Sequence, residues 1–304
     1  MRIAVLGDGA MGCLFGSLLS VRNHVVLVGV HPEKSELLRR EGVRIVQADG
    51  EHLYHPDTTT DTSGMSPVDL VILFVKSMHT REALQTNAGL IGPSTWVATF
   101  QNGAGHDELI SPFVPRTRII IGTTQDNASV RDVGVVVHGG SGVTVIGLVE
   151  GESSILEPIA AEFTACGFPT KVSSEVMRSV WRKLFNNTSI SALTAVLQCS
   201  MEYLGSHQET WDAVVSLIDE ALAVAKADGY PFDREEVIAD IRGVLDRAHG
   251  GYTSIYSDIK AGRKTEVDMI SGYVVRRAKA LQVPVPRQEL MVRLIHALET
   301  KPRD

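Results

Sequence analysis

The amino-acid sequence predicts an α/β protein with an N-terminal doubly wound parallel sheet followed by an all-α C-terminal domain. Short apolar runs rich in β-branched residues, beginning with Arg2–Leu6, alternate with helical patterns as far as residue 172. A glycine-rich turn joins the first apolar run to the first helix, and from Ser173 onward the apolar residues recur with a period of roughly 3.6. We therefore expect two domains, comprising residues 1–173 and 174–304.

The bulk composition is that of an ordinary globular protein. The 304 residues suffice for two domains with large cores, and 44% of them are hydrophobic and 21% are charged. The net charge of −7 is mild and there is no basic run, which argues against a nucleic-acid partner. No apolar stretch reaches the roughly 18 residues of a membrane span, and Asp8 interrupts the N-terminal stretch too early for a signal peptide.

The cysteines and histidines indicate a reducing compartment and no metal site. The three cysteines are an odd number at distant positions, which suits buried thiols in the cytoplasm rather than disulfides. His52 and His55 are the closest pair of histidines, but the sequence implies no third ligand beside them.

The segment that follows the first strand matches a dinucleotide-binding turn. Gly7-Asp8-Gly9-Ala10-Met11-Gly12 stands between the strand Arg2–Leu6 and a helix over Cys13–Val21, as in Rossmann-type domains. The first glycine permits the tight turn, the second lets the backbone approach a pyrophosphate, and the third lets the helix pack closely. The helix N-terminus would then face the phosphates. The alternative is a purely structural turn.

The second strand, His24–Gly29, predicts the cofactor type. A carboxylate at its tip would bind the ribose of NAD, and an arginine would meet the 2′-phosphate of NADP. The tip here reads Gly29-Val30-His31-Pro32, so neither is present. His31 and Lys34 could supply positive charge, whereas Glu33 could favour NAD. Without a carboxylate at the tip itself, we expect NADP and leave NAD open; alternatively, His31 and Lys34 are solvated loop residues.

Two further strand tips carry polar residues. Asp69–Val75 is followed by Lys76, and Thr95–Phe100 is followed by Gln101-Asn102-Gly103. Ligands bind at the carboxyl ends of parallel strands, so both Lys76 and Asn102 are candidate contacts of the nicotinamide or substrate. The alternatives are an exposed lysine and an ordinary turn residue.

The rest of the first domain predicts conventional elements. We expect a polar excursion over His52–Ser66, and a helix over Ser154–Cys166 that ends at Gly167. We also expect a β-hairpin formed by Gly134–His138 and Val143–Leu148.

The helical half contains two segments with candidate chemistry. In Glu175–Leu197, the residues Lys183, Asn187 and Ser191 follow one another at i, i+4 and i+8 and would share a face toward a cavity or solvent. Further on, Thr265 could cap a helix whose first turn holds Glu266 and Asp268, with Ser254 in a turn or short helix before it. By spacing alone, Glu266 is equally a charge that favours a helix N-terminus.

Taken together, these segments resemble the ketopantoate reductase (2-dehydropantoate 2-reductase) family, from Met1 to about Leu298. Several motifs in the same order are more specific than the glycine turn alone. They are GDGAMG at Gly7–Gly12, the strand-tip Lys76, QNG at Gln101–Gly103, WRKLFNN at Trp181–Asn187, LTA at Leu193–Ala195, TSIYSDI at Thr253–Ile259 and TEVD at Thr265–Asp268.

The resemblance implies NADPH-dependent reduction of 2-dehydropantoate to pantoate, on the route to pantothenate. It implies that Lys183 is the general acid and that Glu266 is the carboxylate that works with it. Because the glycine turn and Lys183 belong to different halves, we expect the cleft between the domains. Apolar residues in the last helices could also form a homodimer.

The resemblance also implies substrate and cofactor contacts. Asn187 and Ser254 would hold the substrate, together with Asn102. The predicted cofactor-binding residues are Gly7, Asp8, Gly9, Ala10, Met11, Gly12, His31, Lys76, Asn102 and Glu266.

The sequence departs from the family pattern at three positions. Val30 stands where the family usually has an arginine, which bears on the NADP preference. Ser191 and Gly251 stand where it has asparagines, so reduction of a different 2-oxo acid is an alternative. The sequence is also consistent with a nicotinamide-dependent reductase that uses a histidine such as His249, and with a non-catalytic NADP-binding redox sensor.

Overall fold

Residues 1–248 and 250–302 are described by the structure, which is a computed structural model. The chain divides into two compact units. One holds Met1–Gln101 and His106–Met177, and the other holds Asn102–Gly105 and Arg178–Asp304. The helical unit therefore includes a short segment, Asn102–Gly105, that the sequence assigned to the N-terminal domain.

The first unit is built on a mostly parallel sheet with the strand order β12-β11-β8-β7-β6-β1-β2-β5. β1 lies between β2 and β6, with its Leu6 opposite Val28 on one side and Leu73 on the other. The order from β5 to β8 is that of a doubly wound dinucleotide-binding sheet, which confirms the predicted fold class. The strands are β1 (Arg2–Leu6), β2 (His24–Val28), β5 (Asp57–Thr59), β6 (Leu70–Leu73), β7 (Trp96–Thr99), β8 (Ile119–Thr124), β11 (Thr144–Leu148) and β12 (Thr170–Val172).

A second sheet in the same unit has the order β4-β3-β10-β9. Its strands are β3 (Val43–Gln47), β4 (Gly50–Tyr54), β9 (Asn127–Asp132) and β10 (Val135–Gly140). β4 and β5 fall at or inside the segment expected to be a polar excursion.

The predicted hairpin of residues 134–138 and 143–148 is wrong. β10 pairs antiparallel with β9 and parallel with β3, whereas β11 pairs antiparallel with β8 in the main sheet. Gly134, with φ of 74°, lies in the turn between β9 and β10. The glycine-rich stretch 139–142 therefore passes from one sheet to the other. β9 is mostly exposed and polar, so its sequence carries little apolar signal.

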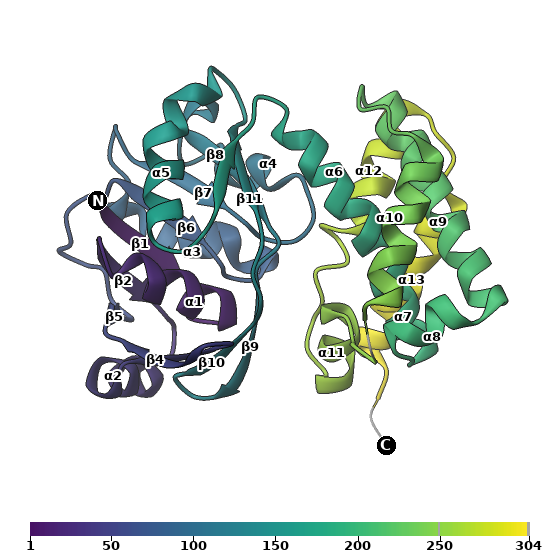
Figure 1. Cartoon of the computed structure of the whole chain (residues 1–304). Coiled ribbons are helices and arrows are strands. Elements are labelled where there is room, and N and C mark those ends of the chain that lie inside the picture. The colour runs from purple at the N-terminus through teal and green to yellow at the C-terminus, as the bar shows by residue number, and fades with distance from the viewer. Residues whose placement is uncertain (249, 303–304) are drawn as a thin grey trace. The chain divides into compact units, whose positions relative to one another are not determined.

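Helices complete the first unit. They are α1 (Ala10–Leu19), α2 (Pro32–Glu41), α3 (Thr80–Thr86), α4 (His106–Ile110) and α5 (Glu157–Ala165), with 3₁₀ turns at Ser77–His79, Ala88–Leu90, Arg116–Arg118 and Ser153–Leu156. Figure 1 shows these elements and the strands in purple to teal.

An aromatic cluster fixes the helix that follows the glycine turn. Phe15 of α1 stacks on Phe168 with ring centroids 4.0 Å apart, and it also contacts Phe74 at 4.8 Å and Phe100 at 5.4 Å. Phe74 and Phe100 follow directly after β6 and β7. The N-terminal helix is thereby packed against the ends of the strands that carry the predicted ligand contacts.

The second unit is helical, as predicted. Its elements, green to yellow in Figure 1, are α6 (Val176–Asn186, which begins in the first unit), a π-helical turn (Asn187–Ser191), α7 (Ala192–Leu197), α8 (Met201–Ser206), α9 (Gln208–Ala227), α10 (Arg234–Asp246), α11 (Ser254–Ala261), α12 (Ser271–Leu281) and α13 (Pro286–Thr300). Within the described residues, every helix falls short of the length or apolar character that a membrane span requires.

Candidate functional site

The three glycines of the turn between β1 and α1 differ in whether the structure leaves room for a side chain. Gly7 has φ of 110°, and a Cβ built on it would lie 2.6 Å from the backbone nitrogen of Val75. A Cβ on Gly12 would overlap the carbonyl oxygen of Gly7. These two positions therefore exclude side chains for reasons internal to the fold.

Gly9, in contrast, is open. It is the N-cap of α1, and a Cβ built on it would meet no heavy atom within 4 Å. No side chain caps α1, and its first turn holds no acidic residue. This helix end could therefore hold an anionic group such as a phosphate.

Two further predicted cofactor residues, Asp8 and His31, lie near the end of the second strand. The Lys34 ammonium donates to the carbonyl oxygen of Asp8 at 2.6 Å and lies 3.2 Å from its Oδ1. His31 is exposed and is the N-cap of α2. Lys34, which the sequence offered as a charge for the cofactor, is thus paired with Asp8.

Lys76 lies at the same edge of the sheet as the glycine turn, because it follows β6 and β6 pairs with β1. The N–H of Val75 donates to the carbonyl of Leu6 at 2.9 Å. The side-chain amide of Gln101 donates to the carbonyl of Val75 at 2.6 Å and to the hydroxyl of Thr80 at 2.9 Å. Gln101 therefore holds the backbone that presents Lys76.

In the helical unit, Lys183 lies on α6 and interacts electrostatically with Glu266. Burial lowers the pKa of Lys183 below the usual lysine value, and the negative charge of Glu266 opposes this shift. The helix is held in place by Trp181, which is fully buried and whose ring centroid is 5.9 Å from that of Tyr273 of α12. The structure thus brings together the two residues predicted to act as a pair.

The helix that carries Lys183 changes its hydrogen-bond pattern immediately afterwards. Asn187 is the first residue of the π-helical turn and Ser191 is the last. Such turns widen the helix and are common at functional sites. The even spacing of Lys183, Asn187 and Ser191 is therefore interrupted, and Ser191 is buried while Asn187 is partly exposed.

α7, the helix that follows the π-helical turn, is tied to the segment that carries Ser254. The hydroxyls of Thr194 and Thr253 are hydrogen-bonded at 2.7 Å. Thr253 is the N-cap of α11 and accepts a hydrogen bond from the N–H of Tyr256. Ser254 is the exposed first residue of this helix. The Thr194–Thr253 bond therefore fixes the start of α11 relative to the helix that carries Asn187.

Glu266 lies in a turn and not, as the sequence predicted, in the first turn of a helix capped by Thr265. That prediction is wrong, because α12 begins only at Ser271. The hydroxyl of Thr265 accepts from the N–H of Val267 at 3.2 Å in a local turn. Ile270, with φ and ψ both −98°, interrupts the turn before α12 begins.

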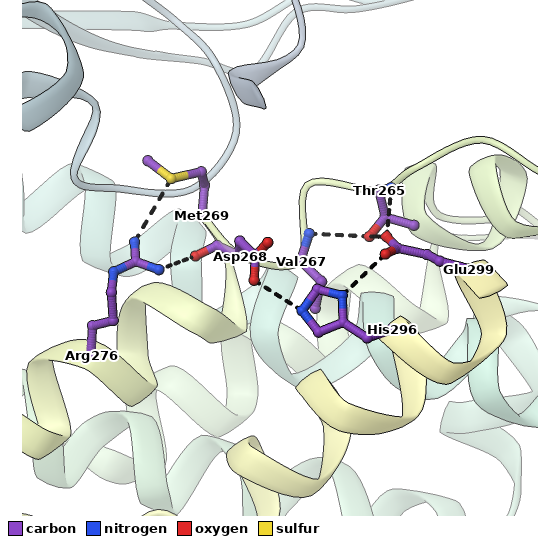
Figure 2. Close-up of polar contacts among 7 residues, drawn as sticks. All are labelled: Thr265, Val267, Asp268, Met269, Arg276, His296 and Glu299. Carbon is purple, nitrogen blue, oxygen red and sulfur yellow. Dashed lines mark hydrogen bonds and ion pairs between the residues drawn. The ribbon is translucent and has the colours of Figure 1, made fainter. Parts of the chain in front are cut away.

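Residues of α13 contact this turn at Thr265 and Asp268, which flank Glu266 in the sequence; Figure 2 shows these contacts. Oε1 of Glu299 accepts from the N–H of Thr265 at 2.8 Å and from its hydroxyl at 2.7 Å. His296 lies 3.1 Å from Glu299 Oε2 and 3.1 Å from Asp268 Oδ1. We call Thr265, Asp268, His296 and Glu299 the turn clamp.

Asn102 lies in the segment that joins the helical unit. The N–H of Ala104 donates to the carbonyl of Met269 at 2.9 Å. Gly103 has φ of 94°, and a Cβ on it would overlap the same carbonyl oxygen. Gly103 is therefore required for the close approach of this segment to the turn that carries Glu266.

Sequence reasoning missed Gln101, His296 and Glu299 as supports of the site. Gln101 stands in the QNG motif, but its two acceptors are 21 and 26 residues away along the chain. His296 and Glu299 are three residues apart on one helix, which marks a pair but not what it binds. Spacing along the chain carries no signal for such contacts.

Two remaining sequence interpretations concern histidines. Within residues 1–248 and 250–302, no three His, Cys, Asp or Glu side chains gather as a metal-binding group. His249, the alternative acid–base residue, lies outside the described residues.

Family models match both halves of the chain. The model described as "Ketopantoate reductase PanE/ApbA" matches residues 3–151, and the one described as "Ketopantoate reductase PanE/ApbA C terminal" matches residues 175–299. The chain is 32% identical over 307 residues to a 2-dehydropantoate 2-reductase of Lactococcus lactis subsp. lactis (strain IL1403), covering 98% of both chains. It is also 32% identical to a 2-dehydropantoate 2-reductase of Pyrococcus abyssi (strain GE5 / Orsay), again covering 98% of both.

Solved structures agree in fold over the same length. A D-mandelate dehydrogenase in complex with NADH and anilino(oxo)acetate superposes with a TM-score of 0.93 at 30% identity, covering 98% of each chain. A PanE/ApbA family ketopantoate reductase from Ralstonia eutropha JMP134 superposes with a TM-score of 0.90 at 26% identity, also covering 98% of each.

Proposed function

Because the chain belongs to the ketopantoate reductase family, we propose that it reduces 2-dehydropantoate to pantoate with a reduced nicotinamide dinucleotide, a step of pantothenate biosynthesis. The observation that supports this proposal most directly is the electrostatic interaction of Lys183 with Glu266 in the helical unit. The other unit has an open glycine turn after its first strand. Both are required: the turn to bind the cofactor and the ammonium group to act on the ketone.

Each predicted site residue has a definite task in this reaction. The cofactor, when bound, supplies the hydride that reduces the carbonyl carbon. Lys183 donates a hydrogen bond to the carbonyl oxygen and then its proton, so that a hydroxyl group forms. Asn187 and Ser254 hold the substrate carboxylate or hydroxyl in place, which makes the transfer effectively unimolecular. Lys76 and Asn102 bind near the nicotinamide and the substrate.

The charge of the pair suits the reductive direction. Burial alone would favour neutral Lys183, and a neutral amine cannot give a proton to the developing alkoxide. Glu266 favours the charged ammonium and so keeps a proton available for transfer. A lysine with a lowered pKa also gives up its proton more readily than a solvated one.

A second candidate is the reduction of another 2-oxo acid. The similarity to a D-mandelate dehydrogenase with bound anilino(oxo)acetate, an aryl-substituted acid, supports it. Ser191 and Gly251 also support it, since each replaces an asparagine of the family pattern with a shorter side chain or none. Fewer amide groups would bind a hydroxylated substrate less well and leave more room for an apolar one.

Three further parts of the proposal come from the sequence. His31 at the tip of β2 supports NADPH, while the NADH complex of the D-mandelate dehydrogenase supports NADH. The unpaired cysteines, of which Cys13 and Cys166 are buried, support a cytoplasmic location. We also propose that the helical unit forms a homodimer, which a measurement of the molar mass in solution would test.

The deciding experiment follows the loss of NADPH and NADH absorbance with a panel of 2-oxo acids. The panel contains 2-dehydropantoate, the 2-oxo acid that corresponds to mandelate, and branched and straight-chain analogues. Highest kcat/KM with 2-dehydropantoate supports the proposed reaction, and highest kcat/KM with an aryl 2-oxo acid supports the second candidate. Cofactor binding without oxidation by any acid would instead indicate the redox sensor.

A further inference from the structure

The side chain of Asp8, the second residue of the glycine turn, occupies the space over Gly29 at the end of β2. A Cβ built on Gly29 would overlap Oδ2 of Asp8 and would lie 2.9 Å from its Cγ. β1 and β2 are adjacent and in register, with Leu6 opposite Val28, so the residues that follow them come close together. Gly29 therefore makes room for the carboxylate of Asp8 at this strand tip.

One oxygen of this carboxylate is engaged and the other is not. Oδ1 lies 3.2 Å from the ammonium of Lys34, which also donates to the Asp8 carbonyl. Oδ2 is buried and has no hydrogen-bond partner within the part of the chain that the structure describes. The Asp8 side chain as a whole remains 14% exposed, so a ligand can reach part of it. An unsatisfied carboxylate oxygen is costly, and a hydroxyl donor from a ligand would offset that cost.

The position of the Asp8 carboxylate at the tip of β2 indicates which ligand group could donate to it. In dinucleotide-binding sheets, the hydroxyls of the adenosine ribose are bound by a carboxylate at the tip of the second strand. Here the tip itself has no carboxylate, and Asp8 supplies one from the neighbouring turn. We propose that the carboxylate of Asp8 accepts a hydrogen bond from the ribose 2′-hydroxyl and thereby selects NADH over NADPH.

The proposal rests on the proposed function as a nicotinamide-dependent reductase, and it departs from the NADPH prediction. A 2′-phosphate would remove the donor hydroxyl and bring a charge of roughly −2 to a carboxylate. Lys34 could offset that charge only by leaving Asp8, which would then be a buried carboxylate without a counter-ion. The strand tip therefore binds a hydroxyl more favourably than a phosphate.

The test measures binding of NADH and NADPH to the full chain by calorimetry, without substrate. Wild-type protein is expected to bind NADH at least about tenfold more tightly than NADPH, the effect of one hydrogen bond to a charged acceptor. Asp8→Asn, which keeps the shape but removes the charge, should shift the ratio toward NADPH by about tenfold. The matched control is Glu36→Gln, which removes an exposed carboxylate from the same helix as Lys34 and should leave the ratio unchanged.

Tighter binding of NADPH by wild-type protein would overturn the proposal, whether or not the variant folds. So would an unchanged ratio in Asp8→Asn whose thermal unfolding matches wild type, or a shift of the same size produced by Glu36→Gln. These outcomes leave the proposed function standing, because a cofactor still binds. If neither cofactor binds, the proposed function fails together with the role of Asp8.

Discussion

The negative charge of Glu266 opposes the effect of burial on Lys183, and the net result is a lysine whose pKa lies below its usual value. The two residues are contributed by different segments, α6 and the turn before α12. Burial and the Glu266 carboxylate shift the pKa of Lys183 in opposite directions. Because they come from different parts of the structure, a substitution can remove the carboxylate and leave the burial in place.

Removing the ammonium group should stop turnover and leave the cofactor bound. Lys183→Ala is expected to lower kcat by about 10²- to 10⁴-fold, the usual contribution of a positioned proton donor. Cofactor affinity, measured by calorimetry, should change little. The neighbouring Arg182→Ala is the control, since Arg182 is exposed and pairs with Glu236 and Asp240 on the surface. Near-normal kcat in Lys183→Ala would exclude Lys183 as the acid.

The pH dependence of the reduction should report the lysine. We expect kcat/KM to fall as pH rises through the lowered pKa of Lys183, below the value of about 10.4 for an unperturbed lysine. In Glu266→Gln the carboxylate that favours the charged form is absent, so the fall should move to lower pH. A midpoint that stays in place or rises in this variant would mean that another group controls the profile.

Two glycines of the same turn should respond in opposite ways to alanine. Gly12→Ala places a Cβ against the carbonyl oxygen of Gly7 and should lower the free energy of unfolding by about 1–3 kcal/mol. Gly9→Ala meets no protein atom within 4 Å and should cost about 1 kcal/mol or less. The same methyl group should weaken cofactor binding by about tenfold or more, because it occupies the space above the helix N-terminus. Chemical denaturation and calorimetry separate the two effects; unchanged affinity in Gly9→Ala would show that no phosphate binds there.

The turn clamp should contribute to stability through Glu299. Its side chain is 10% exposed and accepts two hydrogen bonds from Thr265, so Glu299→Ala is expected to lower the free energy of unfolding by about 2–3 kcal/mol. Glu289→Ala in the same helix is the control, because Glu289 pairs with Arg293 on the surface and its loss should cost about 0.5 kcal/mol or less. Equal losses in urea denaturation would show that the contacts of Glu299 with Thr265 contribute nothing.

The pH dependence of this contribution should come from His296. The hydrogen bond with Glu299, and then the charge of Asp268, raise the pKa of His296 above its usual value. A raised histidine pKa stabilises the folded state below about pH 6.5, and the effect is lost as pH rises through the raised value. His296→Gln should therefore reduce stability near pH 6 by about 0.5 kcal/mol, a small amount because the side chain is 44% exposed, and hardly at all near pH 9. A loss of the same size at both pH values would exclude a charge effect.

Glu299 should also limit stability in acid. Burial alone would raise its pKa, but the hydrogen bonds from Thr265 and His296 lower it overall. A lowered carboxyl pKa stabilises the folded state above its ordinary value of about 4.3, and this is lost as pH falls through the lowered value. The difference in stability between wild type and Glu299→Ala should therefore shrink below about pH 4. A difference that persists there would be due to packing alone.

The sequence by itself determined the elements whose signal is local. The glycine turn follows a buried strand and precedes an apolar helix, and each of these patterns is complete within about 20 residues. The same holds for the change from alternating strands to helices near Ser173. The conformation of these segments depends mainly on neighbouring residues, so their periodicity suffices to predict them.

Tertiary structure alone decided which distant segments meet. β10 pairs with β3 and β9 instead of β11, because strand pairing depends on the available edge and not on proximity along the chain. Glu299 reaches Thr265 across 34 residues, and the carboxylate of Asp8 reaches the space over Gly29. Such contacts are set by packing of the whole unit, since hydrogen bonds and ion pairs form between any groups that the fold brings within reach.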